Sequence, residues 1–280
     1  MTVGAMPTGE QDTRRQQIVD SYLAALALER RPPTLRFLSD ITRRHVDTFA
    51  FSSIGPRLGD ELPIDLEALF DRIVVRGRGG YCFEQNGLLF EVLDELGFHP
   101  RVQLARVIYN RATLPALTHR VTVVDLDGHP FVADVGFGPL GPPHPVALPG
   151  FEQGEQRFRV VEHAPGEHHM QTIVDGEWFS LYRFQLGPYG QADCELGHFY
   201  SHRHPDATFV NHLVASRILD GEVRSLRNRG YRIMRTEGDI EIDIVDAAQL
   251  KRLLDEEFGL LVSDEEAQRL FDEAPVADAT

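Results

Sequence analysis

Long apolar runs are missing from this chain of 280 residues. A helix that crosses a membrane needs about 20 consecutive, mostly apolar residues, and stretches such as residues 22–28 are far shorter. The N-terminal residues also lack the apolar core of a secretory signal peptide. We therefore expect a cytoplasmic protein that does not use a membrane as its partner.

Positive charge is also scarce. The chain has 28 basic and 43 acidic residues, a net charge of −15, and Lys251 is its single lysine. No basic stripe is present, and binding to nucleic acid or to an anionic membrane needs clustered Lys and Arg. These partners are therefore disfavoured, but an anionic small molecule could still be held by a local arginine or by backbone N–H groups.

Only two cysteines occur, Cys82 and Cys194. A structural disulfide between them is not expected in a reducing compartment. A cysteine in an intracellular protein that also has histidine and aspartate elsewhere is a candidate nucleophile.

The remaining composition, 42% apolar and 25% charged, is that of a globular protein. Apolar residues at three-to-four-residue spacing predict helices over 14–29, 34–49 and 65–75. A stronger helix is predicted over 82–96, where Gly97 ends it.

From residue 101 to about 186 the pattern changes to short β-branched and aromatic runs separated by turns, which predicts an antiparallel sheet or barrel. Strands around 222–245 follow, and then two helices that open with capping-box patterns at Asp246 and Ser263. The fold class predicted from these segments is α+β.

The predicted helix that begins at Cys82 is preceded by a glycine-rich segment, Arg-Gly-Arg-Gly-Gly-Tyr over residues 76–81. The glycines allow a tight turn and a close approach of the backbone to a ligand. A thiol at the first position of a helix lies at the positive end of the helix dipole, which favours the thiolate. An inert cysteine buried in a core helix is the alternative, and this segment alone does not decide between them.

A predicted hairpin brings a histidine and a carboxylate together. Asp127-Gly128 is a strong two-residue turn signal between alternating strands. With that turn, Asp134 lies opposite Val121, and His119 is its diagonal neighbour on the same face, within reach of a hydrogen bond. A turn one residue longer or shorter would put the two side chains on opposite faces. A polar strand end and a half-buried histidine are the structural alternatives.

These segments together resemble the arylamine N-acetyltransferases. The similarity lies in RGRGGYCFEQNGLLFEVLDELGF (76–98), THRVTVVDL (118–126), ADVGFG (133–138) and YSHRHPDATFVNHLVASR (200–217). The resemblance implies a cysteine-protease-like core in three parts. These are a helical bundle (1–98), a β-barrel (99–204), and an interdomain segment with an α/β lid (205–280).

The resemblance also implies the chemistry. Cys82 would be the nucleophile that accepts the acyl group, His119 its base, and Asp134 the carboxylate that orients the histidine. Acetyl-CoA would be a co-substrate, with no permanently bound cofactor and no metal. The acetyl group would pass through a Cys82 thioester to an aromatic amine, arylhydroxylamine or hydrazine in a ping-pong reaction.

Further contacts are implied for five residues. Three follow the aspartate directly, and the other two lie before the histidine and in the 200–217 segment; the five residues are Gly136, Phe137, Gly138, Thr118 and Tyr200. The first three would line the acyl and CoA pocket, with Phe137 as an apolar wall. The last helices are candidates for a homodimer contact.

One departure from the family pattern concerns Arg78. The family has a Pro-Phe-Glu-Asn run whose glutamate is expected to pair with this arginine, but the matching residues here are Ala50-Phe51-Ser52-Ser53. We expect another acid, such as Glu84, or a serine hydroxyl to hold Arg78.

Other functions remain open at this level. Cys194, His198, His202 and His204 have a spacing that could bind zinc in a helix, although Gly197 and Pro205 are expected to interrupt one. The same three side-chain types would also serve an amide synthase of a biosynthetic pathway, a cysteine hydrolase or a transglutaminase-like enzyme. A binding module with an inactive site is the non-enzymatic alternative.

Overall fold

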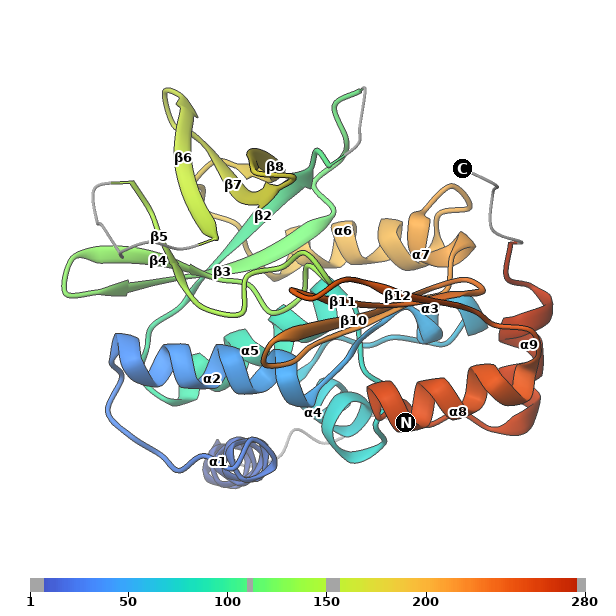
Figure 1. Cartoon of the computed structure of the whole chain (residues 1–280). Helices are drawn as coiled ribbons and strands as arrows, with labels where there is room; N and C mark the ends of the chain where they lie inside the picture. Colours follow the sequence, from blue (N-terminus) through green and yellow to red (C-terminus); the bar gives the residue numbers. More distant parts are fainter. Residues whose placement is uncertain (1–7, 110–112, 150–156, 276–280) are drawn as a thin grey trace.

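The computed structural model describes residues 8–109, 113–149 and 157–275. Two antiparallel sheets and three groups of helices make up the molecule (Figure 1). The blue helices of the first 50 residues lie below a green-to-yellow sheet, the orange C-terminal strands cross the middle of the view, and the red C-terminal helices lie at the lower right (Figure 1). The predicted α+β class is confirmed. None of the helices in the described ranges is long and apolar enough to cross a membrane.

Helices occupy most of the first 95 residues. They are α1 (Thr8–Ala25), α2 (Leu35–Thr48), α3 (Ile54–Leu58), α4 (Leu66–Phe70), the π-helical turn η1 (Asp71–Val75) and α5 (Cys82–Glu95). The helix predicted over 65–75 is thus α4 followed by a π-helical turn, and α1 ends four residues earlier than expected. Apolar faces of α1, α2 and α5 form the first core, which includes Tyr22, Leu38 and Leu89.

Helix α5 begins at Cys82, as predicted. The Tyr81 N–H donates to the Glu84 carboxylate at 3.2 Å, which satisfies a backbone donor at the helix start. In the preceding loop Gly79 has a φ of +61°, and a Cβ there would lie 2.5 Å from the Ala50 carbonyl oxygen. Only glycine fits this close passage, so the loop that delivers Cys82 has one well-defined path.

The seven-stranded sheet consists of β2 (Arg101–Val107), β3 (His119–Leu126), β4 (His129–Ala133), β5 (Val146–Ala147), β6 (Phe158–Ala164), β7 (Glu167–Val174) and β8 (Glu177–Phe184). Their spatial order is β5-β4-β3-β2-β8-β7-β6, with every pair antiparallel. The two edge strands β5 and β6 contact each other, so the sheet is a nearly closed barrel. Its interior is apolar and includes Val121, Met170 and Leu181.

The last third contains α6 (Gln191–Arg203), α7 (Thr208–Asn211), β9 (Val214–Ile218), β10 (Glu222–Arg227), β11 (Gly230–Arg235), β12 (Ile240–Asp243), α8 (Ala247–Phe258) and α9 (Asp264–Asp272). The side chains of Asp246 and Ser263 cap α8 and α9, as predicted. The five-stranded sheet has the order β1-β9-β10-β11-β12, and β1 (Phe51–Ser52) comes from the N-terminal third. This strand pairs with β9 and also bonds Gly80, in the loop before Cys82.

Candidate active site

The predicted hairpin register is confirmed. Strands β3 and β4 pair Thr122 with Ala133 and Leu126 with His129, across a turn in which both Asp127 and Gly128 have positive φ. Extending this register by one residue places Asp134 where the sequence predicted it. The His119 Nε2 atom lies 2.7 Å from Asp134 Oδ2, and both side chains are buried.

Cys82 completes a cluster with these two residues, called the Cys82 cluster below. Its side chain is only 3% exposed, and Sγ donates to the Thr118 carbonyl oxygen at 3.4 Å. A hydrogen bond between Cys82 and His119 is among the interactions that favour protonated His119. The structure therefore brings together the three side chains that sequence reasoning had selected from separate segments.

Asn86 is the residue that sequence reasoning missed. Its Nδ2 donates to Asp134 Oδ1 at 2.9 Å and to the Arg120 carbonyl oxygen at 2.6 Å, and its Oδ1 accepts from the Val135 N–H at 2.9 Å. It lies four residues after Cys82 on α5, hence on the same helix face. The four-residue spacing between Cys82 and this amide side chain is the signal in the sequence that could have identified Asn86.

Charge and burial set the protonation of the histidine and the aspartate. Burial of His119 disfavours its charged form, but the Asp134 charge and the hydrogen bonds to Asp134 and Cys82 outweigh it and raise the pKa of His119 to about 10. Burial likewise opposes ionisation of Asp134. The charge of His119 and the hydrogen bonds from His119, Asn86 and the Gly136 N–H nevertheless lower the pKa of Asp134. The pair is therefore an imidazolium and a carboxylate at neutral pH.

Aromatic rings enclose the histidine. Phe137 meets His119 edge to face with ring centroids 5.3 Å apart, and Tyr182 of β8 lies 4.8 Å from it. Burial and the nearby Asp134 charge raise the pKa of Tyr182 well above its ordinary value, so its hydroxyl stays neutral. Tyr182 had no distinguishing signal in the sequence, because barrel strands are rich in aromatic residues.

The remaining predicted contact residues differ in their relation to the cluster. A Cβ on Gly136 would lie 2.8 Å from Cys82 Cα, so the backbone after Asp134 passes directly against the cysteine. Gly138 has a φ of +91° and lies near Ser216.

Thr118 contacts Cys82 through its carbonyl group, whereas Tyr200 lies on α6 with its ring stacked on His204.

The expectation that Glu84 holds Arg78 is wrong. Arg78 makes a two-bond contact with the Glu266 carboxylate of α9, at 2.9 Å for each bond, and also donates to the Leu261 carbonyl oxygen at 2.8 Å. Glu84 instead forms a buried ion pair with Arg72 at 2.9 Å. Burial raises the pKa of Glu84 to about 7, although Arg72 and the Tyr81 N–H pull in the other direction.

The serine alternative for Arg78 is also wrong. Ser52 Oγ accepts from the Ile54 N–H at 3.1 Å, and Ser53 Oγ bonds the backbone of Val214 and His212 beside β9. The Ser53 hydroxyl therefore joins the end of β1 to β9, whereas the Ser52 hydroxyl bonds only within its own segment. The partner of Arg78 had to come from a helix 188 residues further along the chain.

The zinc hypothesis does not match the described side chains. Gly197 does not interrupt the segment, because α6 is continuous from Gln191 to Arg203. Gly197 lies close to the Phe83 ring, since a Cβ at this position would be 2.6 Å from it. His198 contacts Tyr81 Oη through Nδ1 at 2.5 Å and the Leu62 carbonyl oxygen through Nε2 at 2.7 Å. Within the ranges that the structure describes, no three His, Cys, Asp or Glu side chains are grouped so that they could hold a metal.

The chain is similar to known proteins over most of its length. A family model described as N-acetyltransferase matches residues 34–267. An arylamine N-acetyltransferase of Mycolicibacterium smegmatis is 35% identical over 253 residues, which cover 87% of this chain and 92% of that protein. An arylamine N-acetyltransferase / N-hydroxyarylamine O-acetyltransferase of Salmonella typhimurium is 33% identical over 239 residues, covering 83% of this chain and 84% of that protein.

Solved structures are also similar to this chain over most of its length. The structure of Mycobacterium marinum arylamine N-acetyltransferase in complex with CoA has a TM-score of 0.85 and 31% identity, covering 91% of this chain and 99% of that one. The family model, the related sequences and the solved structure agree with one another. This chain is an enzyme of the arylamine N-acetyltransferase family.

Proposed function

We propose that this protein transfers an acetyl group from acetyl-CoA to the nitrogen of an arylamine, arylhydroxylamine or hydrazine. The names of its relatives and the CoA complex of the M. marinum protein support this reaction. The observation that carries the mechanism is the 2.7 Å contact between His119 and Asp134 beside a cysteine at a helix N-terminus. The residue roles below are part of the proposal.

In the first half-reaction, the proton of Cys82 resides on the His119 imidazolium, and the Cys82 sulfur attacks the thioester carbonyl of acetyl-CoA. The backbone N–H of Cys82, the first of α5, is a candidate donor to the oxyanion that forms. The C–S bond to CoA then breaks, His119 protonates the leaving CoA thiolate, and acetyl-Cys82 remains. Asp134 fixes the orientation of the imidazole and stabilises its charged form.

In the second half-reaction, the amine nitrogen attacks acetyl-Cys82, and His119 removes a proton from that nitrogen. The Cys82 sulfur leaves and the proton stays on His119, so the enzyme returns to its starting state. Exchange between thioesters is nearly balanced, whereas conversion of a thioester to an amide is downhill. The second step therefore makes the overall transfer favourable.

Five further residues are proposed as substrate contacts. Gly136, Phe137 and Gly138 continue directly from Asp134, and Phe137 already forms a wall against His119. Thr118 reaches Cys82 through its carbonyl group. Tyr200 is proposed only from the family resemblance. The division into parts 1–98, 99–204 and 205–280, the cytoplasmic location and a homodimer contact also remain proposals.

Intact-protein mass spectrometry tests the proposal. The protein is mixed with acetyl-CoA without amine, and 5-aminosalicylate is then added. We expect one acetyl group on the wild type and on Cys194→Ser, no acetyl group on Cys82→Ala, and loss of the group when the arylamine is added. Loading that no arylamine discharges would favour an amide synthase, and no loading would favour a hydrolase or an inactive site.

A further inference from the structure

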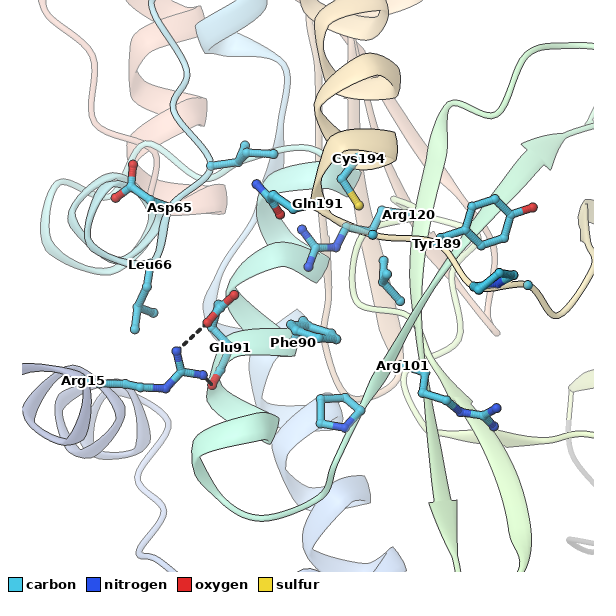
Figure 2. Close-up of a pocket in the computed structure, with 16 residues that line it drawn as sticks. Arg15, Asp65, Leu66, Phe90, Glu91, Arg101, Arg120, Tyr189, Gln191 and Cys194 are labelled. Carbon is cyan, nitrogen blue, oxygen red and sulfur yellow. Dashed lines mark hydrogen bonds and ion pairs between the residues drawn. The ribbon is translucent and has the colours of Figure 1, made fainter. Parts of the chain in front are cut away.

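A cavity lies on the face of β3 opposite to the face that carries His119. It has a volume of about 720 Å³ and lies between α5, β2 and the start of α6 (Figure 2). Successive side chains of a strand point to opposite faces, so His119 belongs to the Cys82 cluster while the next residue, Arg120, lines this cavity. The proposed acetyl transfer does not use it.

Arg120 is an unusual residue to find there. It is 3% exposed, and its Nε is buried without a hydrogen-bond partner. Among the described residues, its guanidinium takes part in no ion pair and donates no hydrogen bond, although it lies over the Phe90 ring at 5.3 Å. Buried charges in proteins are normally paired, because an unpaired one loses its hydration without compensation.

The carboxylates of Glu91 and Asp65, which line the cavity, already have other partners. Arg15 binds Glu91 Oε2 at 2.7 Å (Figure 2). Arg15 also contacts Asp94 at 3.1 Å. Asp65 accepts from the Ala68 N–H at 3.0 Å as the cap of α4. Arg120 therefore presents a positive group to the cavity without a carboxylate of its own.

Helix α5 makes room for this arginine at a cost. Gly87 lies in the middle of the helix, where glycine is less favourable than alanine. A Cβ there would lie 3.2 Å from Arg120 Nη1 and 3.0 Å from Leu69. A helix-interior glycine and a buried unpaired charge thus occur at one point, which is typical of a functional site rather than of optimised packing.

The lining of the cavity indicates the chemistry of an occupant. Near Arg120 the walls are apolar and aromatic, with Phe90, Val102 and Tyr189, and the N-terminal end of α6 at Gln191 contributes the positive end of a helix dipole. An arginine fork binds a planar carboxylate through two parallel hydrogen bonds. We propose that this cavity binds a small molecule with one carboxylate and an apolar body, its carboxylate on Arg120.

Cys194 offers a local probe, because it lines the cavity and its sulfur is drawn beside Arg120 (Figure 2). Since the chain has two cysteines, Cys82→Ser leaves Cys194 as the only thiol. The experiment measures alkylation of Cys194 by iodoacetamide in this variant with sodium benzoate, neutral benzamide or inorganic phosphate present. Calorimetric titration of the same variant gives the affinities.

We expect benzoate to slow the alkylation of Cys194 in a saturable manner and benzamide to bind about tenfold or more weakly, as expected for loss of hydrogen bonds between charged groups. Adding Arg120→Gln should abolish the benzoate effect. The matched control Arg101→Gln, which removes an exposed arginine of the same cavity, should keep it.

The proposal would be overturned by no binding heat with benzoate, by equal effects of benzoate and benzamide, or by protection by phosphate equal to that by benzoate. The benzoate–benzamide comparison needs no change at Arg120, so it decides even if Arg120→Gln fails to fold. Binding of benzoate in the Cys82 cluster instead would give heat without protection of Cys194 and would also contradict the proposal. None of these measurements depends on acetyl transfer.

Discussion

Two polar clamps hold the chain around Cys82, and they differ in burial and in distance along the sequence. The hairpin clamp consists of His119, Asp134 and Asn86, with the His119 and Asp134 side chains at most 2% exposed. The terminal clamp consists of Arg78 and Glu266, whose side chains are 15% and 34% exposed. The first clamp sets the protonation of His119 and Asp134, and the second holds the glycine-rich loop against the last helix.

This difference in burial leads to different expected energies. Solvent screens the partly exposed Arg78–Glu266 pair, and such pairs contribute about 0–1 kcal/mol. The buried clamp is costly to disrupt, because removal of one partner leaves another polar group unpaired. Variants of the hairpin clamp should therefore change mainly the rate of acetyl transfer, and variants of the terminal clamp should change mainly how the glycine-rich loop is held.

The largest effect is expected for Asp134→Asn. The amide keeps the shape but no longer stabilises a protonated His119 or fixes its orientation, so acetylation of Cys82 in one turnover should slow by about 10³-fold or more. The rate of CoA release after mixing with acetyl-CoA measures this. Asp125→Asn, at an exposed carboxylate that accepts from the Gly128 N–H of the hairpin turn, is the control and should keep the wild-type rate. Equal rates for Asp134→Asn and the wild type would contradict the assigned role.

Asn86→Ala should have the next largest effect. Loss of its buried hydrogen bonds should lower the free energy of unfolding by about 1–3 kcal/mol. Because Asp134 then loses one of its fixed partners, acetylation should slow by about 10- to 100-fold.

Gln85→Ala is the matched control for Asn86. Gln85 is equally buried on the same helix, but it bonds His45 at 2.7 Å and the Ala50 carbonyl oxygen at 2.8 Å. We expect a similar loss of stability with a much smaller change in rate. If both variants lost the same fraction of activity, Asn86 would serve only the fold.

The pH dependence of stability sharpens the comparison further. The pKa of His119 is about 10 in the folded protein, above its unfolded value of about 6.5. The stabilisation from its charged form is therefore fully present below pH about 6.5 and is lost as the pH rises through about 10. At the acid end, the lowered pKa of Asp134 gives stability that is lost as the pH falls below its unfolded value of about 3.9.

Urea unfolding of the wild type and Asp134→Asn across this range measures the contribution. The difference in unfolding free energy should be constant near pH 5–6 and shrink between pH 6.5 and 10. A difference that does not vary with pH would show that the pair is not charged in the folded protein.

The smallest effect is expected for Arg78→Met. Loss of the screened pair with Glu266 and of the hydrogen bond to Leu261 should lower the unfolding free energy by about 1–2 kcal/mol, and activity should fall less than tenfold. Arg76→Met is the control, because that arginine is 56% exposed and pairs with Asp71 at 2.7 Å. A loss of activity as large as that of Asp134→Asn would remove the distinction between the clamps.

The difference between the two clamps in distance along the sequence explains which parts of the site could be predicted. His119 and Asp134 are 15 residues apart in one hairpin, and the Asp127-Gly128 turn determines which side chains share a face. Helix α5 could be predicted because its apolar stripe and Gly97 are local signals. The position of Cys82 against the hairpin is a tertiary contact, and it was expected only through the resemblance to a family.

Other features depend on contacts between distant segments, which one sequence does not reveal. Glu266 belongs to the capping box predicted at Ser263, and nothing near it in the sequence pointed to Arg78. Strand β1 is two residues long and joins a sheet formed more than 160 residues later, so its pairing had no periodic signal. Arg120 resembled any polar residue of a strand until the structure showed its burial.

Mapping the acetyl group to a residue tests the central claim most directly. After brief exposure of the wild type to acetyl-CoA, the protein is digested at low pH and the peptides are sequenced by tandem mass spectrometry. We predict the acetyl group on Cys82 and none on the peptide that contains Cys194. Acetylation of Cys194, or of no cysteine in a protein that still forms acetylated arylamine, would contradict a thioester mechanism at Cys82.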